Sequence, residues 1–436
     1  MQAHRILVKS FYWKLLHFLV VFISNIVLVR FFGAEITGKF YTLIYTGSLA
    51  VTAFNLGLDV SLNYFLSQKK LTIRFVQRLI PAIVFIALIF SMPAIYFYLG
   101  QADMLFPTQS TIIILTGIFI SGGLLFNFTT AIYTSINQHH VVNRTAFFFG
   151  LVALILSVMS IWIYDRQTAL IALFMIHFLF SFLPGFFLFI KTFYRNDVLK
   201  KVDTSHTAPI QKVFQYSLAA YSINIIFFIA SKLAVFVLPF WAAPEALGNF
   251  MQGYRIVEYI GMIAAFIYFP VIALTADSSA IRSEPMILFL VRLSNTFVLL
   301  LGIFILLAGP YVLPWIFGNS FSQLDEILLY FLPGILAVCS STFFTAYFFG
   351  KGKTKTNFYS AVILLLSLGI LLWVLAKDGN VKAAALAFSV ANLLSLGYDM
   401  FQFHKLNPIG WKDMLMINAR DWHYLRTVLP QKLIRA

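Results

Sequence analysis

The feature that most constrains this chain is a succession of long apolar runs, separated by short polar links, that covers most of its 436 residues. In lipid only a helix of about 20 mostly apolar residues, or a closed barrel of alternating strands, satisfies the backbone. The runs do not alternate, and 11% of the residues are charged, against about 25% in soluble domains. The sequence therefore predicts an all-α polytopic membrane protein and excludes a soluble enzyme or a disordered chain.

Twelve membrane-spanning helices are expected, in two lobes of six. Their expected bounds are 11–32, 41–66, 75–99, 110–134, 145–164, 168–193, 211–240, 247–275, 286–309, 323–349, 357–376 and 381–404. The first run is longer than the apolar core of a signal peptide, so we expect it to be retained as a span. The predicted organisation is an amino-terminal lobe over 1–195, a cytoplasmic linker over 196–210, a second lobe over 211–404 and a basic cytoplasmic tail over 405–436.

The distribution of Lys and Arg predicts the orientation. With both termini in the cytoplasm, 24 of the 31 Lys and Arg residues lie in cytoplasmic segments, 4 lie in outer loops and 3 fall in or near spans. Positive residues concentrate on the cytoplasmic side of membrane proteins. This split also accounts for most of the +15 net charge. Those cations are expected to face anionic membrane lipids, so no nucleic-acid partner is needed.

The two halves resemble weak copies of each other. Residues 32–40 and 241–250 are each expected to form a short outer turn with an acidic residue, followed by Gly-x-Phe at the start of the next helix. Gly38 and Gly248 are expected to allow the close turns. Six spans on each side of a basic link are typical of a transporter built from two parallel repeats.

Polar side chains line one face of several expected spans. In the second span they recur every three or four residues, which is the spacing of a helical face: Ser48, Thr52, Asn55, Asp59 and Asn63. Asn224 and Lys232 lie in the seventh span, Arg255 and Glu258 in the eighth, and Asp399 in the twelfth. A charge at the centre of the bilayer costs about 2.5–3.5 kcal/mol, so such groups usually face a partner or a binding site.

Each charge also has a structural interpretation. Arg30 lies close to the end of the first span, where its side chain could reach the outer interface instead of a ligand. Arg255 and Glu258 are three residues apart and could neutralise each other. Asp59 and Asp399 lie toward the cytoplasmic ends of their helices, within reach of headgroups. Lys232 lies well inside its span, and for it we favour a functional role.

The sequence predicts no cofactor and no metal site. The single cysteine, Cys339, allows no cysteine-based metal site, and the adjacent His139 and His140 lack a third ligand nearby. Gly352-Lys353-Thr354 ends like a phosphate-binding loop, but Tyr347 stands where that motif requires glycine. No hydrolase triad or metalloprotease motif is present.

Several ordered motifs carry a family resemblance. They are Leu28–Phe40, with the run Val29-Arg30-Phe31-Phe32-Gly33-Ala34-Glu35; Asn55-Leu56-Gly57-Leu58-Asp59; Leu313-Pro314-Trp315-Ile316-Phe317-Gly318; and Lys382-Ala383-Ala384-Ala385-Leu386-Ala387. Together they resemble bacterial polysaccharide flippases of the Wzx type, in the multidrug/oligosaccharidyl-lipid/polysaccharide exporter (MOP) superfamily. Lys382 departs from the family pattern, in which glycine is common at that position.

The resemblance implies two six-helix lobes around a central cavity lined by basic residues, and transport by alternating access. The implied cargo is an undecaprenyl-pyrophosphate-linked oligosaccharide, an O-antigen or exopolysaccharide repeat unit, moved across the bacterial inner membrane without making or breaking a bond. The candidate substrate-binding residues are Arg30, Lys232, Arg255, Asn55 and Asn224. Asp59, Glu258 and Asp399 are the candidates for coupling to H+ or Na+, because the chain has no nucleotide-binding domain.

Two other functions remain open at this point. A drug/cation antiporter of the same superfamily would carry cationic cargo and would be expected to have an acidic site. A membrane glycan polymerase would be expected to have a large outer loop with catalytic Arg or His, whereas the outer loops here are short. Other polysaccharide assembly proteins are possible partners.

Overall fold

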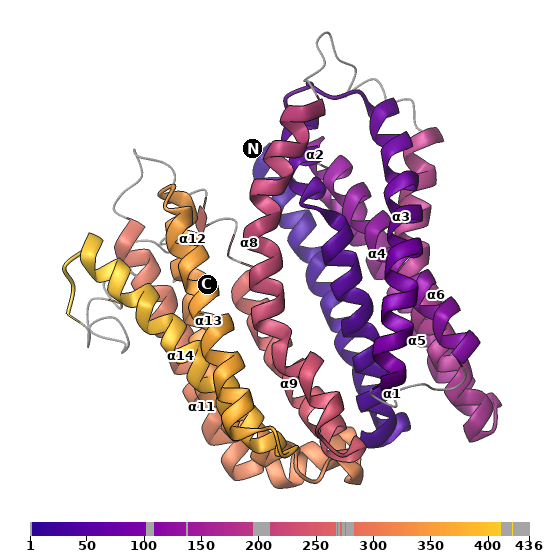
Figure 1. Cartoon of the computed structure of the whole chain (residues 1–436), viewed down its shortest axis with the longest axis vertical. Coiled ribbons are helices and arrows are strands. Elements are labelled where there is room, and N and C mark those ends of the chain that lie inside the picture. The colour runs from indigo at the N-terminus through magenta and orange to yellow at the C-terminus, as the bar shows by residue number, and fades with distance from the viewer. Residues whose placement is uncertain are drawn as a thin grey trace, which may run out of the picture. The chain divides into compact units, whose positions relative to one another are not determined.

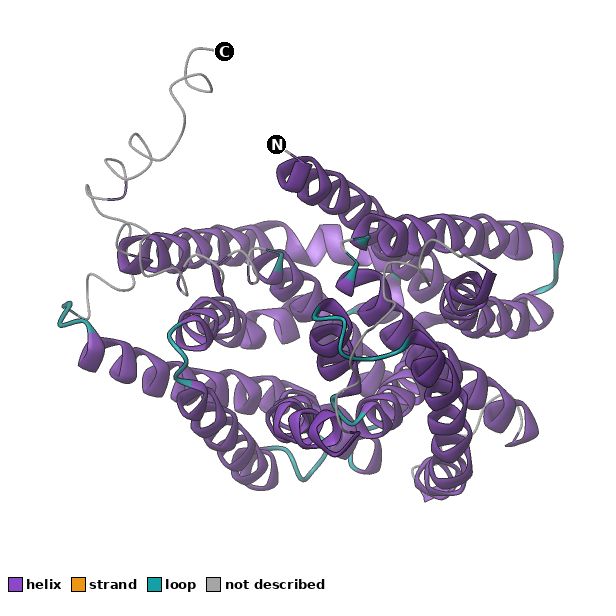
Figure 2. Cartoon of the chain, turned by 90° about the horizontal axis from the view of Figure 1, so that it is seen from above, coloured by secondary structure: helices purple, strands orange, loops and turns teal. Residues whose placement is uncertain are grey.

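The computed structural model describes residues 2–101, 109–136, 138–194, 210–266, 268, 271–272, 275, 283–410 and 421. These residues form helices and contain no strand (Figures 1 and 2). The α-helices are α1 (Gln2–Asn55), α2 (Leu58–Ser67), α3 (Ile73–Gln101), α4 (Gln109–Ser135), α5 (His139–Ile163), α6 (Arg166–Tyr194), α8 (Ile210–Val237), α9 (Pro244–Ala265), α11 (Ser283–Phe317), α12 (Leu324–Gly350), α13 (Thr354–Leu375) and α14 (Val381–Leu406). Two short 3-10 helices, η1 (Leu238–Phe240) and η2 (Asn319–Phe321), precede α9 and α12.

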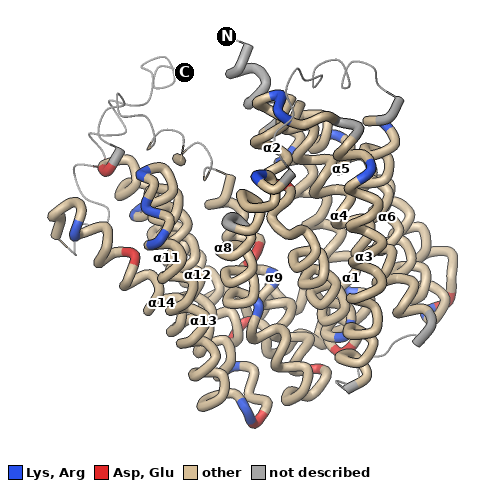
Figure 3. The backbone as a smooth tube through the Cα atoms, turned by 45° about the horizontal axis from the view of Figure 1, so that its top comes forward, with Lys and Arg blue, Asp and Glu red and all other residues tan. Residues whose placement is uncertain are grey.

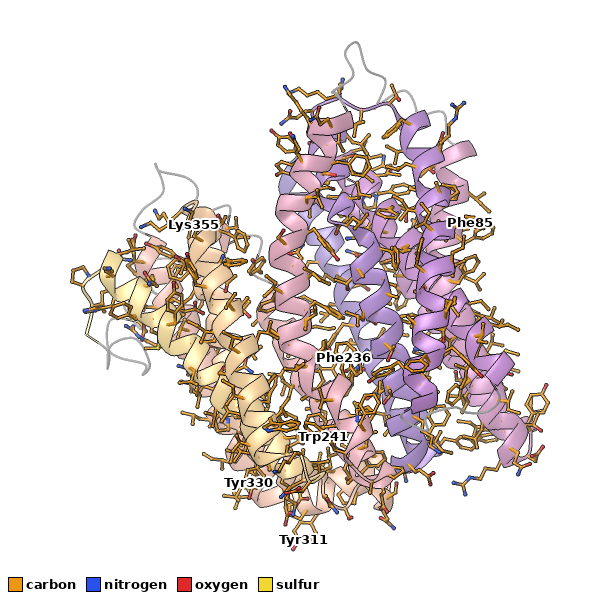
Figure 4. All side chains as sticks on the ribbon, viewed as in Figure 1. Phe85, Phe236, Trp241, Tyr311, Tyr330 and Lys355 are labelled. Carbon is orange, nitrogen blue, oxygen red and sulfur yellow. The ribbon has the colours of Figure 1, made fainter. Side chains whose placement is uncertain are left out.

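The prediction of an all-α polytopic membrane protein is confirmed. Within the described ranges, nine helices are long and apolar enough to cross a membrane. Their outer surfaces carry large apolar side chains. Phe85 of α3 is 65% exposed and Tyr311 of α11 is 79% exposed, and both project away from the helices (Figure 4). Such surfaces are suited to acyl chains rather than to water. Residues 196–209 of the predicted linker, and residues 411–420 and 422–436 of the predicted tail, lie outside the described residues.

The chain divides into two compact units, Met1–Ile229 and Ala230–Ala436. The division falls inside α8, so the first part of this helix packs with the amino-terminal helices. The boundaries expected from the sequence, at 195 and 211, lie earlier in the chain and remain predictions.

In the first unit α4 packs against α6, and α1 packs against α5 and α4. Glycines bring two of these backbones together. A Cβ atom added at Gly122 of α4 would lie 2.4 Å from the Cα of Phe182, and one added at Gly185 of α6 would lie 2.7 Å from the carbonyl oxygen of Gly122. Small residues allow this close helix packing in lipid, where apolar burial gives little drive for association.

The expected outer turn over residues 32–40 is wrong in detail. Only Gly33 leaves the helical range inside α1, with φ 75° and ψ 175°, a conformation that suits glycine. The amide of Asn25 hydrogen-bonds the hydroxyl of Tyr41, sixteen residues on, whereas a straight helix would separate them by about 24 Å. The two segments therefore fold back on each other at Gly33, while Gly38 lies within the helix.

The second expected turn, over 241–250, also needs correction. The chain leaves α8 through η1 and reaches α9 at Pro244, so the link is short and Gly248 lies buried inside α9. Pro244 suits the first position of a helix, because the backbone N–H that it lacks would have no partner there. Asn249, next to Gly248, ties α9 to the turn before α12. Its amide donates to the carbonyl of Ser320 at 3.2 Å, and its oxygen accepts from the backbone N–H of Gln323 at 3.3 Å.

Several expected helix bounds also shift. α5 begins at His139 rather than 145, α11 continues to Phe317 rather than 309, and α9 ends at Ala265 rather than 275. In the second unit α12 packs against α14, α11 and α9, and α13 packs against α14. The buried hydroxyl of Ser340 in α12 donates to the side-chain oxygen of Asn295 in α11 at 2.8 Å, so a polar contact joins these helices within the apolar interior.

Candidate functional site

Two cations and one carboxylate form a cluster between α8 and α9, and charged residues are otherwise sparse along the helices (Figure 3). The ammonium of Lys232 in α8 pairs with Oε1 of Glu258 in α9. The guanidinium of Arg255, one turn earlier on α9, pairs with Oε2 of the same carboxylate at 2.8 Å. Glu258 thus bridges two cations that come from different helices.

Two tyrosines complete this group, and we call the five residues Lys232, Tyr254, Arg255, Glu258 and Tyr259 the α8–α9 cluster. The Lys232 ammonium lies 4.6 Å from the centre of the Tyr254 ring, and the Tyr254 hydroxyl donates to the carbonyl of Ser231 at 2.7 Å. The Arg255 guanidinium lies 5.0 Å from the centre of the Tyr259 ring. Aromatic faces attract cations most strongly where water is scarce, so the rings help to hold both positive groups in place.

The α8–α9 cluster carries one net positive charge. The side chains of Lys232, Glu258 and Arg255 are 12%, 15% and 22% exposed, so each is largely removed from solvent but none is sealed. The two positive charges of Lys232 and Arg255 exceed the single negative charge of Glu258 by one. The arrangement therefore favours the approach of a second anion.

The second polar face, on the expected second span, does not lie on a continuous helix. α1 ends at Asn55 and α2 begins at Leu58, because Leu56 and Gly57 both adopt positive φ, of 49° and 66°. A hydrogen bond of 2.8 Å from the Asn55 amide to Oδ1 of Asp59 spans the break. This polar contact joins the end of α1 to the start of α2. Asp59 lies in the first turn of α2, where the helix dipole favours a negative charge.

The break is packed against the first part of α8, within the first unit. A Cβ atom added at Gly57 would lie 2.5 Å from the carbonyl oxygen of Ser217. Nearby, the hydroxyls of Ser61 and Ser217 hydrogen-bond at 2.9 Å, and the rings of Tyr64 and Tyr216 stack with centres 4.8 Å apart. Gly57 is therefore required both for its backbone conformation and for its lack of a side chain.

We expect Gly57→Ala to destabilise the protein by about 1–3 kcal/mol, because alanine is disfavoured at positive φ and its Cβ would meet backbone atoms that cannot rotate away. The thermal unfolding midpoint in detergent is the measurement. Gly397→Ala in α14 is the matched control, since a Cβ there meets nothing within 4 Å. Equal thermal unfolding midpoints for Gly57→Ala and Gly397→Ala would contradict the close contact between Gly57 and the backbone of α8.

The other candidate residues lie outside the α8–α9 cluster. Arg30 is exposed on α1, three residues before the Gly33 kink, and Asn224 is exposed on α8. Asp399 is fully buried in α14. The structure thus brings Lys232, Arg255 and Glu258 together, and separately Asn55 and Asp59.

Sequence reasoning missed two parts of this arrangement. It considered Glu258 only with Arg255, because three-residue spacing is visible on one helix, whereas Lys232 is 26 residues away and meets Glu258 through helix packing. It also passed over Tyr254, although Tyr254 and Glu258 are four residues apart and share a helical face.

No protein-family model and no curated protein matches the sequence, whereas solved structures match its fold. The inward-facing conformation of a multidrug resistance MATE family transporter of the MOP superfamily matches with a TM-score of 0.70 and 14% identity, over 93% of this chain and 99% of that one. The lipid II flippase MurJ, in an inward closed conformation, matches with a TM-score of 0.69 and 16% identity, over 97% and 91%. A MOP superfamily transporter from Pyrococcus furiosus, described by a reverse polarity of its binding pocket, matches with a TM-score of 0.64 and 13% identity, over 93% and 96%. The fold of this chain is therefore that of the MOP superfamily transporters.

Proposed function

We propose that this protein is a flippase that moves an undecaprenyl-pyrophosphate-linked oligosaccharide from the cytoplasmic to the outer leaflet of the bacterial inner membrane. The observation that carries the proposal is the net positive charge of the α8–α9 cluster within a largely apolar helical unit. In this proposal the two lobes alternate in opening to either side, and both termini are cytoplasmic.

The chemistry of the cargo fits this charge. A diphosphate is too strongly hydrated to cross lipid unless cations replace its water. Arg255 offers a planar donor fork that matches a phosphate, and Lys232 offers a compact point charge. Charge-assisted hydrogen bonds of this kind are about twice as strong as neutral ones. Glu258 would hold the two cations while no cargo is present, and the pyrophosphate would then share or displace it.

Two further observations support the proposal. The motif between Leu28 and Phe40, and the motifs that follow it, resemble polysaccharide flippases, and one structure of the same fold is a lipid II flippase. Translocation makes and breaks no covalent bond, so we propose a transporter and not an enzyme. An O-antigen or exopolysaccharide repeat unit as the glycan, anionic lipids around the basic loops and contacts with other polysaccharide assembly proteins belong to the same proposal.

Coupling to an ion gradient is a separate part of the proposal. The three candidate carboxylates differ in their surroundings. Glu258 is paired with two cations, and Asp59 accepts a hydrogen bond from Asn55. Asp399 is fully buried in α14, which makes it the strongest candidate for binding H+ or Na+. The exposed Arg30, Asn224 and the half-buried Asn55 stay in the proposal as contacts for the sugar or the headgroup.

The α8–α9 cluster argues against the drug/cation antiporter alternative. A cationic drug would meet two positive groups and one negative group there, so its approach would be repelled. The MATE transporters of the same fold do not decide between the two functions, because the identity of 14% or less to those structures shows the fold alone.

Deletion of the gene tests the proposed function. We expect the deletion strain to lose surface glycan and to accumulate a complete undecaprenyl-pyrophosphate-linked repeat unit, and the intact gene on a plasmid to restore the surface glycan. Lipid extraction followed by mass spectrometry measures the intermediate. Normal surface glycan together with increased drug sensitivity would instead favour the antiporter, and unpolymerised repeat units already delivered outside would favour a polymerase.

A further inference from the structure

Helix α12 contains a proline in its interior, and a side chain of α14 meets its backbone at that point. Pro333 has no backbone N–H, so it removes one hydrogen bond of the helix, and its ring crowds the preceding turn. The next bond along the helix would run from the N–H of Gly334 to the carbonyl of Tyr330, because a helix joins residues four apart. The helix is therefore weakened between Tyr330 and Gly334.

The buried hydroxyl of Ser389 in α14 bridges this pair of backbone groups. It accepts a hydrogen bond from the N–H of Gly334 at 3.0 Å and donates one to the carbonyl of Tyr330 at 2.6 Å. In lipid such groups need partners, and serine side chains of neighbouring helices supply them next to proline. A side chain that enters the hydrogen-bond ladder of a helix also causes a bend.

Gly334 makes room for this bridge. A Cβ atom added there would lie 2.8 Å from the hydroxyl oxygen of Ser389 and 2.9 Å from Cδ1 of Phe388. Gly334 lies on the buried side of α12, whereas Pro333 lies on the exposed side. Two consecutive residues of α14, Phe388 and Ser389, therefore meet the backbone of α12 where the proline weakens it.

The ring of Phe388 belongs to an aromatic group that reaches the α8–α9 cluster. It contacts Phe331 of α12 edge to face, with ring centres 5.4 Å apart, and Tyr254 of α9, with ring centres 5.6 Å apart. Phe331, two residues before Pro333, also contacts Tyr254, with ring centres 6.3 Å apart. All three rings are buried. The position of Tyr254 therefore depends on where α12 and α14 place the two phenylalanine rings.

Tyr254 in turn holds one of the two cations of the cluster. The Lys232 ammonium lies 4.6 Å from the centre of its ring, and its hydroxyl donates to the carbonyl of Ser231 in α8. Protein interiors are close-packed, so a buried ring that shifts must move its neighbours. Two contacts, that of Phe388 with Tyr254 and that of Tyr254 with Lys232, therefore connect α14 to the cation.

We propose that Ser389 is a positioning residue of the α8–α9 cluster. Its hydroxyl holds α12 in a bent form, and the bend places the two phenylalanine rings against Tyr254, which keeps Lys232 in the geometry that binds an anion. Withdrawal of the hydroxyl would let Gly334 pair directly with Tyr330, so α12 has two arrangements that satisfy these backbone groups. A packed helix with two discrete arrangements can couple two places in a protein. The effect on cargo binding rests on the proposed flippase function, whereas the effect on Tyr254 does not.

A fluorotyrosine in place of Tyr254, in the purified full-length protein in detergent, reports the surroundings of this ring without any lipid. We expect Ser389→Ala to shift its fluorine resonance, whereas Ser389→Thr, which keeps the hydroxyl, should leave the resonance close to its natural position. Ser367→Ala in α13 is the matched control, because the Ser367 hydroxyl donates to two carbonyls of its own helix.

Pro333→Ala provides a second variant, so the test remains informative if Ser389→Ala does not fold. It restores the missing N–H and removes the cause of the bend, so we expect it to shift the resonance as well. An unchanged resonance in whichever of Ser389→Ala and Pro333→Ala folds would overturn the proposal.

Binding of undecaprenyl pyrophosphate tests the consequence for the cluster. We expect Ser389→Ala to bind this lipid at least about fivefold more weakly than the natural protein, with unchanged binding of undecaprenol, and Ser389→Thr to keep most of the affinity. If the natural protein binds the pyrophosphate lipid and Ser389→Ala binds it equally well, the proposal is wrong. If the natural protein does not bind this lipid, the proposed function fails, and the fluorine resonance of position 254 still decides the role of Ser389.

Discussion

Lys232→Glu is expected to abolish complementation of a deletion strain, with at least about a 100-fold loss of transport. The substitution replaces one of the two cations around Glu258 with a second carboxylate, so the α8–α9 cluster changes from one net positive charge to one net negative charge. Disrupting one partner of a buried ion pair costs about 3–5 kcal/mol, and every 1.4 kcal/mol corresponds to about tenfold in an equilibrium. A pyrophosphate would also be repelled where it is now attracted.

Surface glycan per cell, normalised to the amount of protein in the membrane, is the measurement. Lys232→Arg is the control, because arginine keeps the charge and reaches the same carboxylate. We expect it to retain most of the transport. Lys232→Met keeps a side chain of similar length without the charge, and we expect its transport to lie between that of Lys232→Glu and that of Lys232→Arg. Full complementation by Lys232→Glu at normal protein levels would show that positive charge at this position is not needed.

Glu258→Gln is expected to have the second large effect, and it should strengthen the binding of the cargo rather than weaken it. The glutamine keeps the shape of the side chain but no longer neutralises either cation, so Lys232 and Arg255 become available to an anion. We expect the variant to bind a pyrophosphate lipid about tenfold or more tightly than the natural protein and to release it more slowly. Transport should therefore fall although binding improves, since the cargo no longer competes with an internal carboxylate.

Thermal unfolding with and without undecaprenyl pyrophosphate measures this difference. Without lipid the variant should unfold at a lower temperature, because two partly buried cations lose the carboxylate that they share. The lipid should stabilise the variant more than it stabilises the natural protein. Glu326→Gln is the matched control: Glu326 pairs with Lys382, but at 54% and 38% side-chain exposure this pair contributes little. Weaker lipid binding by Glu258→Gln would mean that Glu258 is needed to position the cations rather than to compete with the cargo.

The sequence was sufficient for most of the fold because lipid leaves few alternatives. Hydropathy alone predicts helices such as 323–349 and 381–404, which the structure places at Leu324–Gly350 and Val381–Leu406. It did not predict the end of α11. The span was expected to stop near 309, whereas the helix continues through Pro310 and Pro314 to Phe317. Neighbouring helices and adjusted geometry allow proline inside membrane helices.

The sequence could not predict those parts of the two polar regions that depend on tertiary contacts. The regular spacing from Ser48 to Asn63 predicted one continuous helical face, whereas Leu56 and Gly57 interrupt the helix. Local spacing could not show this break, because it is packed against α8 at Gly57. Likewise, Asp399 was recognisable as an intramembrane charge, but the sequence could not show that it is fully buried in α14. Local spacing predicts which residues share a face; it does not predict what that face meets.

The central claim is that the positive charge of the α8–α9 cluster binds the pyrophosphate of a lipid-linked glycan. Its most direct test is the affinity of the purified protein for undecaprenyl pyrophosphate and for undecaprenol, which carries the same chain without the phosphates, compared with that of a Lys232→Glu, Arg255→Glu double variant. We predict that the natural protein prefers the pyrophosphate lipid by at least about tenfold and that the double variant has lost this preference. An undiminished preference in the double variant would contradict the account.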